Sequence, residues 1–321
     1  MQADIAGAFQ IARLAARFDW TWSPDDVPRF CDVAEWQFAG PSARAGISTN
    51  LEIARPVGFV SIGREVWDDA SQIRVLRQIS VEATSSDLDL GTGPTHATID
   101  AFALAASLFV SEWGDPARTV PGSSAKLAWD LPCVVIQVEI DKSDLVLSLI
   151  NPHYEQWIES CSGEAEADWR RYHGDERPSD AVSPSLAGGW TSFADALALT
   201  LSRLPEEGQL TLVAGSDHWL RFSFGTNSRY GLLLKCEFPR VRGIDSAEHA
   251  RTGWAKPDRR NRNWAKRITW PAPFDGYHSL AQDAVAVLRD MFGVDDPTSI
   301  SVHSRSSSYE EPASLEAFKG N

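Results

Sequence analysis

The residue types that most often perform catalysis or bind metals are scattered along this sequence, at spacings that neither task uses. None of the seven histidines lies four positions from another histidine, or beside a second histidine or cysteine, as zinc ligands would. The sequence contains neither HExxH nor GxSxG, the motifs of metalloproteases and of many serine hydrolases. A triad built from distant segments leaves no spacing signature, and nothing in the sequence favours one. We therefore expect no catalytic residue and no metal ligand.

Three short stretches resemble cofactor or ion sites but depart from them in spacing. Residues 91–93 lack the third glycine of a dinucleotide-binding turn, and residues 122–126 lack the four-residue spacer of a phosphate-binding loop. Residues 87–91 begin like a calcium loop, but its twelfth position is Thr98 rather than the glutamate that would bind the ion. A solvated turn explains the acids there. We therefore expect no cofactor.

Residues 251–267 form a segment that combines dense positive charge with aromatic side chains. The segment contains seven cations, one acid and two tryptophans. This composition suits nucleic acid, and it suits an acidic protein surface equally, because arginine and tryptophan are typical interface anchors. The third interpretation is an exposed loop whose tryptophans fold back and close the domain. Under the second interpretation the partner-binding residues are Trp254, Arg259, Arg260, Arg262 and Trp264, together with Trp219 from an earlier segment.

The overall charge narrows the choice of partner. The chain has 321 residues, a formal net charge of −14 and a pI near 4.9. A field of that sign repels phosphate, which argues against nucleic acid and favours a protein partner. The thirteen tryptophans are unusual, and we expect core packing to account for most of them, with an exposed cluster as the alternative.

The N-terminal twenty residues predict an amphipathic helix rather than a signal peptide. An early acid, Asp4, and two arginines, Arg13 and Arg17, interrupt the apolar residues. No apolar run approaches the roughly 20 residues that span a bilayer, so we expect no membrane association. The cysteines form no CxxC pair, and Cys133 and Cys236 lie in apolar stretches typical of reduced core thiols. Together these features predict a cytoplasmic protein.

Composition divides the chain into two domains. Residues 160–189 are rich in Ser, Gly, Pro and charge, which is typical of a linker between a domain at 1–159 and one at 190–303. Residues 304–321 have the composition of a flexible tail. In each half, consecutive strands lie between helices, a pattern of α+β domains built on antiparallel sheets.

Hydrophobic periodicity and capping residues place the individual elements. In the first half they predict helices at 4–17, 24–36 and 95–114, and strands at 47–53, 58–62, 73–83, 125–130, 133–140 and 145–150. In the second half they predict helices at 190–204, 245–252 and 277–292, and strands at 209–214, 218–224, 230–237, 268–270 and 299–303. We expect Ser23 to cap the helix at 24–36, and Thr191 or Ser192 to cap the helix at 190–204.

The second half also carries an order of features that is shared with a known group. A helix opens at Trp190, the strands WLRFSF (219–224) and YGLLLKCEF (230–238) follow, and then come Gly253-Trp254, Pro257 and Asn263-Trp264 before a last helix and strand. On these features residues 190–303 resemble the TY-Chap group, bacterial domains related to type III secretion chaperones and to the YbjN-like fold. The first half resembles an uncharacterised actinobacterial domain family, through FDWTWSPDDVPRF (18–30) and the pair LPCVVIQVEI and LVLSLINPHY.

The TY-Chap resemblance implies a secretion-chaperone-like domain, in which a curved antiparallel sheet and helices present a groove to a client segment without a cofactor. It makes a non-enzymatic chaperone or adaptor, linked to a secretion or toxin system, the leading hypothesis. Because secretion chaperones often dimerise, a homodimer is one expected state. The second hypothesis is an immunity protein whose acidic surface neutralises a basic toxin, and the third is a hydrolase or transferase with a scattered site.

Overall fold

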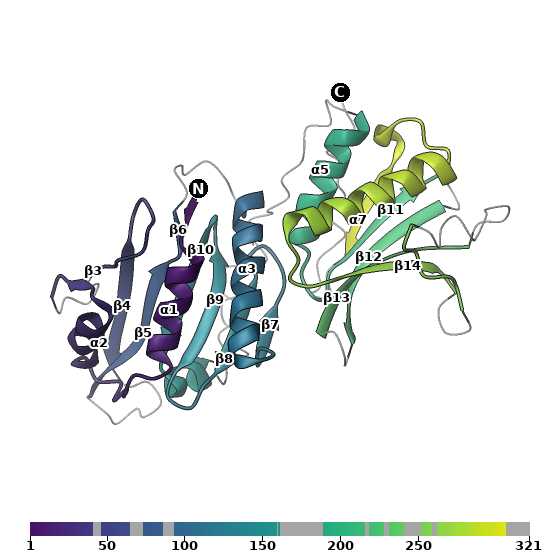
Figure 1. The fold of residues 1–321 in the computed structure, drawn as a ribbon. Helices are drawn as coiled ribbons and strands as arrows, with labels where there is room; N and C mark the ends of the chain where they lie inside the picture. The colour runs from purple at the N-terminus through teal and green to yellow at the C-terminus, as the bar shows by residue number, and fades with distance from the viewer. Residues whose placement is uncertain are drawn as a thin grey trace, which may run out of the picture. The chain divides into compact units, whose positions relative to one another are not determined.

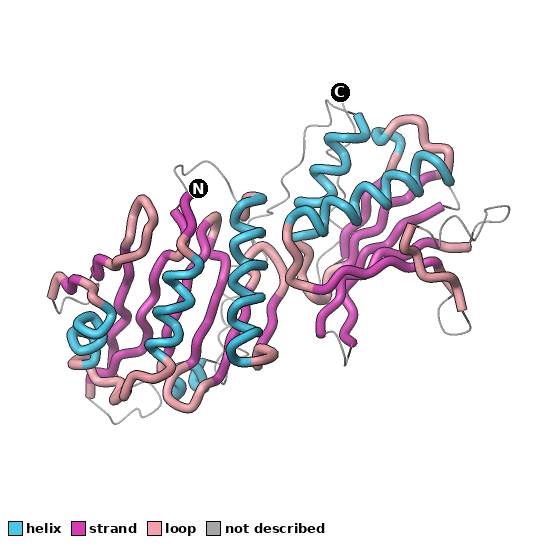
Figure 2. Tube along the Cα trace, in the orientation of Figure 1, coloured by secondary structure: helices cyan, strands magenta, loops and turns pink. Residues whose placement is uncertain are grey.

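A computed structural model of the protein describes residues 1–40, 46–64, 73–85, 93–158, 160, 189–215, 218–227, 231–240, 252–258 and 262–305. The chain divides into two compact units, Met1–Thr119 with Ser124–Asp180 and Val120–Ser123 with Ala181–Asn321. Each unit contains an antiparallel sheet and helices, so the α+β prediction is confirmed (Figure 2). The predicted linker, the predicted tail and the predicted short helix at 245–252 lie almost entirely outside the described residues.

The N-terminal unit is built on an eight-stranded sheet that carries helices α1 (Ile5–Ala15) and α3 (His96–Trp113) on one face (Figure 1). Helix α2 (Asp26–Ala34) lies near the β2 edge, and a two-stranded ribbon pairs β1 (Gln2–Ala3) with β6 (Thr84–Ser85). The strands of the large sheet follow the order β2 (Gln37–Phe38), β3 (Gly46–Ser48), β4 (Val57–Arg64), β5 (Arg74–Glu82), β10 (Asp144–Ile150), β9 (Val135–Asp141), β8 (Lys126–Asp130) and β7 (Arg118–Val120).

The core of this unit follows from side-chain alternation along its central strands. Leu147 of β10 lies opposite Val138 of β9 and Val81 of β5, and all three are buried. Phe109 of α3 and Leu147 line the same apolar cavity beneath the helices. On the other face of the sheet, Tyr154 packs on a smaller apolar cluster that includes Ile150. Because successive side chains of a strand point to opposite faces, one strand supplies both layers.

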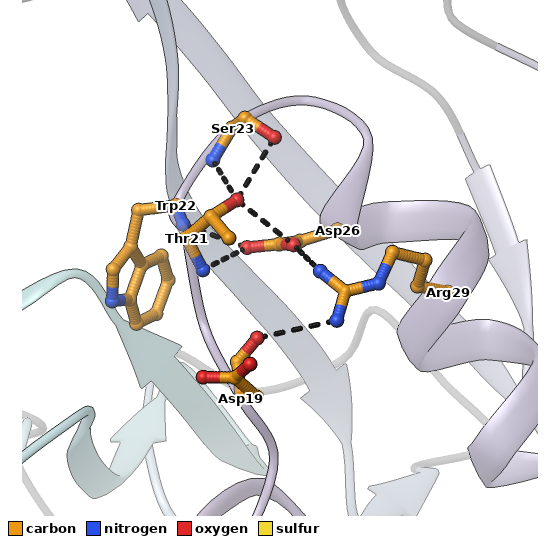
Figure 3. A network of polar contacts seen from close by, with 6 residues as sticks. All are labelled: Asp19, Thr21, Trp22, Ser23, Asp26 and Arg29. Carbon is orange, nitrogen blue, oxygen red and sulfur yellow. Dashed lines mark hydrogen bonds and ion pairs between the residues drawn. The ribbon is translucent and has the colours of Figure 1, made fainter.

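A buried carboxylate holds the segment between α1 and α2 in place (Figure 3). Asp26 is fully buried, and its Oδ2 accepts hydrogen bonds from the backbone N–H groups of Thr21 (2.7 Å) and Trp22 (2.6 Å). Its Oδ1 accepts a hydrogen bond from the Thr21 hydroxyl (3.1 Å) and forms an ion pair with Arg29. Trp22 has a φ of 57°, a left-handed conformation that is uncommon for a bulky residue. The bonds to Asp26 stabilise that turn.

The same turn ties distant segments of the unit together. The carbonyl oxygen of Trp22 accepts a hydrogen bond from the N–H of Leu76 in β5 (2.8 Å). The indole N–H of Trp22 donates to the carbonyl oxygen of Cys133 (3.0 Å), and the indole ring stacks on that of Trp20 (4.5 Å between centroids). Helix α2 begins at Asp26 rather than at a Ser23 cap, and its N-cap residue Asp25 makes no side-chain cap bond. The carboxylate of Asp26, the first residue of the helix, instead bonds to the backbone that precedes the helix, at Thr21 and Trp22.

The C-terminal unit is a five-stranded antiparallel sheet with two helices on one face (Figure 1). Helices α5 (Gly189–Ser202) and α7 (Phe274–Ala286) pack against each other, and a π-helical turn, Val287–Met291, continues α7. The strand order is β14 (Trp264–Thr269), β13 (Gly231–Phe238), β12 (His218–Asn227), β11 (Gln209–Ala214) and β15 (Ser301–Arg305).

Several element boundaries in this unit differ from the predicted ones: α7 begins at Phe274 rather than at 277, and β15 begins at Ser301 rather than at 299. Helix α5 begins at Gly189, before the expected caps Thr191 and Ser192. Strand β14 begins at Trp264, four residues before the predicted strand at 268–270. The basic composition of residues 264–267 hid this strand, because its pairing with β13, from Phe238 opposite Trp264 to Leu233 opposite Thr269, is a long-range interaction.

The predicted burial of the cysteines is correct for one of the two predicted core thiols and wrong for the other. Cys236 is buried in β13, and burial together with nearby Asp283 raises the pKa of its thiol. Cys31 is also buried, and burial, with a smaller effect of Asp32, raises the pKa of its thiol to about 11. Cys133 is exposed, so its prediction as a core thiol is wrong. The reason is that β9 begins at Val135, which leaves Cys133 in the preceding turn.

We expect Asp26→Ala to lower the free energy of unfolding of the N-terminal unit by about 2–4 kcal/mol. The substitution removes the acceptor of two backbone N–H groups, and each donor left unsatisfied in the interior costs about 1–3 kcal/mol. Urea unfolding followed by tryptophan fluorescence measures the change. Asp25→Ala is the matched control, because Asp25 is exposed and makes no cap bond, and its effect should stay within about 0.5 kcal/mol. Equal effects of the two substitutions would contradict the role given to Asp26.

Thiol labelling should separate the three described cysteines. In a Cys161→Ser background, a disulfide reagent at about pH 8 should react with Cys133 alone in the folded chain. Cys31 and Cys236 are buried and have raised pKa values, so little thiolate forms and the reagent has no access. Absorbance of the released thiol, before and after denaturation in urea, gives the count. Rapid labelling of Cys236 in the folded chain would contradict the packing of β13 beneath the helices.

Candidate functional site

Strict alternation along the C-terminal strands separates a face covered by α5 and α7 from a face that no described helix covers. Even-numbered positions of β11, β12 and β13 point toward α5 and α7, and they include Leu212, Phe222 and Leu234, each at most 1% exposed. Lys266 of β14 lies on the same side, where its ammonium group contacts the Asp283 carboxylate of α7. Odd-numbered positions therefore point away from the helices.

We call the side away from α5 and α7 the open face, defined by Thr211, Val213, Trp219, Arg221, Ser223, Leu233, Lys235, Glu237, Arg267 and His303. These residues are half-buried or exposed, except Glu237, which is only 7% exposed. In Figure 1, α5 and α7 both lie on the opposite side of the sheet. The open face is thus a broad surface of mixed polar and apolar character.

Four side chains on the open face form a connected group. The guanidinium of Arg221 lies over the indole of Trp219, 4.8 Å from the ring centroid. Arg221 of β12 stands opposite Glu237 of β13, with 4.0 Å between Nη1 and Oε1, and Nζ of Lys235 lies 3.0 Å from Oε2 of Glu237. Glu237 therefore contacts two cations at once. Contacts of this kind limit the rotamers of Arg221 and present the Trp219 ring in a defined position.

The structure separates the residues predicted to bind a partner. Trp219 lies on the open face and is half-buried. Trp254 and Trp264 are each only 4% exposed and pack on Phe238, with centroid distances of 4.8 and 6.4 Å. These two indoles belong to the core, which corrects their interpretation as exposed anchors. Arg262 is exposed in the preceding loop, and Arg259 and Arg260 lie outside the described residues.

The described part of residues 251–267 therefore fits best the third interpretation, a loop whose tryptophans fold back and close the domain. Ala255 forms a β-bridge to Ala265, with both of the backbone hydrogen bonds that close it. This bridge brings Trp254 back onto the domain, next to the strand that Trp264 begins. Every tryptophan in the described part of the chain is buried or half-buried, as expected if core packing dominates.

The prediction missed Arg221, Lys235, Glu237 and Arg267, although the sequence contained a signal for them. In WLRFSF and GLLLKCEF the apolar residues alternate with Trp, Arg, Ser, Lys and Glu. Period-2 alternation identifies a two-sided strand, and its polar positions mark the face away from the core. Cross-strand register, which joins Arg221 to Glu237 and Lys235 to Arg267, is available only from the fold.

One further pair of side chains, His278 and Asp195, has the residue types of a catalytic site, but it is a weaker candidate for a functional site than the open face. Nε2 of His278 in α7 lies 2.9 Å from Oδ1 of Asp195 in α5, and the imidazole stacks on Phe274. No hydroxyl or thiol group is hydrogen-bonded to this pair among the residues that the structure describes, so it links two helices without a nucleophile. No group of three or more His, Cys, Asp or Glu side chains that could hold a metal occurs within the described ranges.

Two family models match the chain. Residues 183–306 match the model described as "T3SS (YopN, CesT) and YbjN peptide-binding chaperone 3", TY-Chap3. The C-terminal unit is thus similar to this family, and we call it the TY-Chap3 domain after the match. Residues 6–151 match a family of unknown function, DUF6301, so that model corresponds to the sheet of the N-terminal unit. Neither the curated proteins nor the solved structures contain a match to the chain. No helix that the structure describes is both long and apolar enough to cross a membrane.

The TY-Chap3 match covers all elements of the C-terminal unit, including the open face and both covering helices. The resemblance expected from the Trp190 helix and the two central strands is thereby confirmed. The motif residues Trp254 and Trp264 contribute to that resemblance as core residues, because both pack against β13. The open face is therefore the described surface of the TY-Chap3 domain that offers a partner both apolar and charged side chains.

We expect Trp254→Ala to lower the free energy of unfolding of the TY-Chap3 domain by about 3–5 kcal/mol, the usual cost of truncating a buried large aromatic side chain. Trp219→Ala should cost about 1 kcal/mol or less, because the Trp219 ring is half-buried on the open face. Urea unfolding followed by circular dichroism measures both. A Trp254 variant as stable as the unmodified chain would restore the interpretation of Trp254 as a surface anchor.

Proposed function

We propose that this protein is a non-enzymatic peptide-binding chaperone or adaptor, whose client segment lies on the open face of the TY-Chap3 domain. The observation that carries the proposal is the half-buried Trp219, which Arg221 holds on the open face of a domain that matches a peptide-binding chaperone family. A sheet face of this kind binds through contact and hydrogen bonding and requires no bond to be made or broken.

The open face offers the two kinds of contact that a peptide needs. Trp219 stands opposite Val213 in the β11–β12 pairing, so an apolar surface faces the client at one end of the strands. Tryptophan and arginine are the residue types that most often dominate binding energy, with losses of about 2 kcal/mol or more on truncation. Ser223 and Thr211 add hydroxyl groups that can bond an extended backbone.

The edge strand β15 offers a further route for an extended client. It is the last strand of the five-stranded sheet and pairs only with β11 among the described strands. A client strand that adds to such an edge gains backbone hydrogen bonds. The open face is the stronger candidate because it also carries the Trp219 ring, which an edge contact alone would leave unused.

The finer parts of the proposal concern the setting of the protein. We place the protein in the cytoplasm, as an adaptor in a secretion or toxin system. A homodimer is one state that this proposal includes. The setting is in keeping with the secretion chaperones that the family description names. The immunity hypothesis needs an acidic surface against a basic toxin. The open face does not favour that hypothesis, because cations outnumber acids on it.

We expect Trp219→Ala to weaken client binding by at least tenfold while the chain stays folded. Affinity purification of the tagged full chain from its native host, followed by mass spectrometry, identifies the client, and an array of overlapping client peptides locates the bound segment. Fluorescence anisotropy with that labelled segment then measures the loss.

Trp190→Ala is the matched control for this experiment. Trp190 is another half-buried tryptophan of the TY-Chap3 domain, but it begins α5 on the helix side and its indole N–H donates to the Asp295 carbonyl oxygen (3.2 Å). Its removal should leave peptide binding intact. If both variants bind the client as well as the unmodified chain does, the open face is not the binding surface.

A further inference from the structure

The charge of the open face is opposite to that of the chain. The whole protein has a formal net charge of −14. The odd-numbered positions that the structure describes on this face carry three cations and one acid, namely Arg221, Lys235, Arg267 and Glu237. A local excess of positive charge on an acidic protein creates a field that attracts anionic groups to this face and repels them elsewhere.

Two of these cations are placed in a way that folding alone does not favour. Lys235 of β13 stands directly opposite Arg267 of β14, in the middle of the paired segment. Like charges in direct cross-strand positions destabilise a sheet. The like-charged pairs Arg64 with Arg74 and Asp141 with Asp144 are instead the terminal pairs of their hairpins, where the strands separate.

Glu237 compensates for only part of this charge. Its two oxygens contact Arg221 and Lys235, at 4.0 and 3.0 Å, and no ion pair joins Arg267 to an acid in the described structure. Arg267 is exposed. The open face therefore keeps a cation that forms no ion pair with a described residue, beside a second cation that is only partly balanced.

The remaining cation is fixed against an apolar surface. Arg221 stacks on Trp219, its Nε is buried without a hydrogen-bond partner in the described structure, and 39% of its side chain is exposed. Arginine presents a planar set of donors that matches a carboxylate, and stacking on an aromatic ring leaves those donors available. A carboxylate and an apolar group would thus find their partners side by side at Arg221 and Trp219.

We infer that the open face selects acidic peptide segments, in which carboxylate side chains alternate with an aromatic or aliphatic one. The carboxylates lie on Arg267, Lys235 and Arg221, and the apolar side chain lies on Trp219. This inference rests on the proposed function and names the chemistry of its client. A peptide suits the face better than a nucleic acid does, because the acidic remainder of the chain repels a continuous phosphate backbone.

Three labelled peptides test the selection on the full chain by fluorescence anisotropy. The first alternates glutamate and leucine around one phenylalanine, the second has glutamine in place of each glutamate, and the third has lysine. We expect the glutamate peptide to bind at least tenfold more tightly than the glutamine peptide, and the lysine peptide to bind most weakly. Raising the salt to about 0.5 M should reduce the preference, because exposed charges are screened.

Arg267→Glu is the sharpest variant, because it moves binding and stability in opposite directions. It should weaken binding of the glutamate peptide by about tenfold, since it reverses a charge that faces the client. The same substitution places an acid opposite Lys235, so the urea midpoint of unfolding should stay equal or rise. Arg289→Glu, an equal charge change at the exposed end of α7, should leave both binding and preference unchanged.

The outcomes separate this inference from the function on which it rests. If all three peptides bind equally and Trp219→Ala abolishes binding, peptide binding stands and the acidic preference is wrong. If the folded chain binds none of them, the acidic preference is wrong, and the proposed function is then decided by the purified client segment with Trp219→Ala. A preference retained in Arg267→Glu, or displacement of the glutamate peptide by single-stranded DNA at similar affinity, overturns the acidic-peptide assignment.

Discussion

Side-chain alternation in β11, β12 and β13 is the constraint on which the TY-Chap3 domain depends. It places Leu212, Phe222 and Leu234 beneath the two helices and, in the same strands, Trp219 and Arg221 on the open face. A register slip of one residue would move the apolar set into solvent and charge beneath the helices. The burial that stabilises the domain therefore also fixes which side chains a client can reach.

The same constraint explains how much could be predicted from the sequence. Local periodicity was sufficient for most helices and for the central strands, because apolar spacing alone distinguishes a helix from a two-sided strand. It was insufficient for β14, where the neighbours Lys266 and Arg267 read together as part of one basic segment. In the fold they point to opposite faces, Lys266 to Asp283 of α7 and Arg267 to the open face. Only pairing with β13 separates them.

Tryptophan was the least reliable guide to the site, for a physical reason. Its large ring is stabilising both in a core and at an interface, so the residue type does not decide between them. Trp254 and Trp264 close the core around Phe238, whereas Trp219 remains on the open face. The turn around Asp26 was equally out of reach, since it depends on contacts of Trp22 with Leu76 and Cys133, more than fifty residues away.

The two sheets differ in the charges that stand opposite each other on neighbouring strands, and this difference is relevant to function. In the N-terminal sheet Lys126 of β8 stands opposite Glu139 of β9, with 3.4 Å between Nζ and Oε2, an arrangement that supports pairing of the strands. In the TY-Chap3 sheet the charged pair Lys235 with Arg267 lies inside the paired segment and joins two cations. Positions where a sequence departs from its own local rules are expected at functional sites. A glutamate at position 267 would stand opposite Lys235 with the opposite charge and favour the pairing of β13 with β14, and the arginine found there is the charge that we propose a client carboxylate meets.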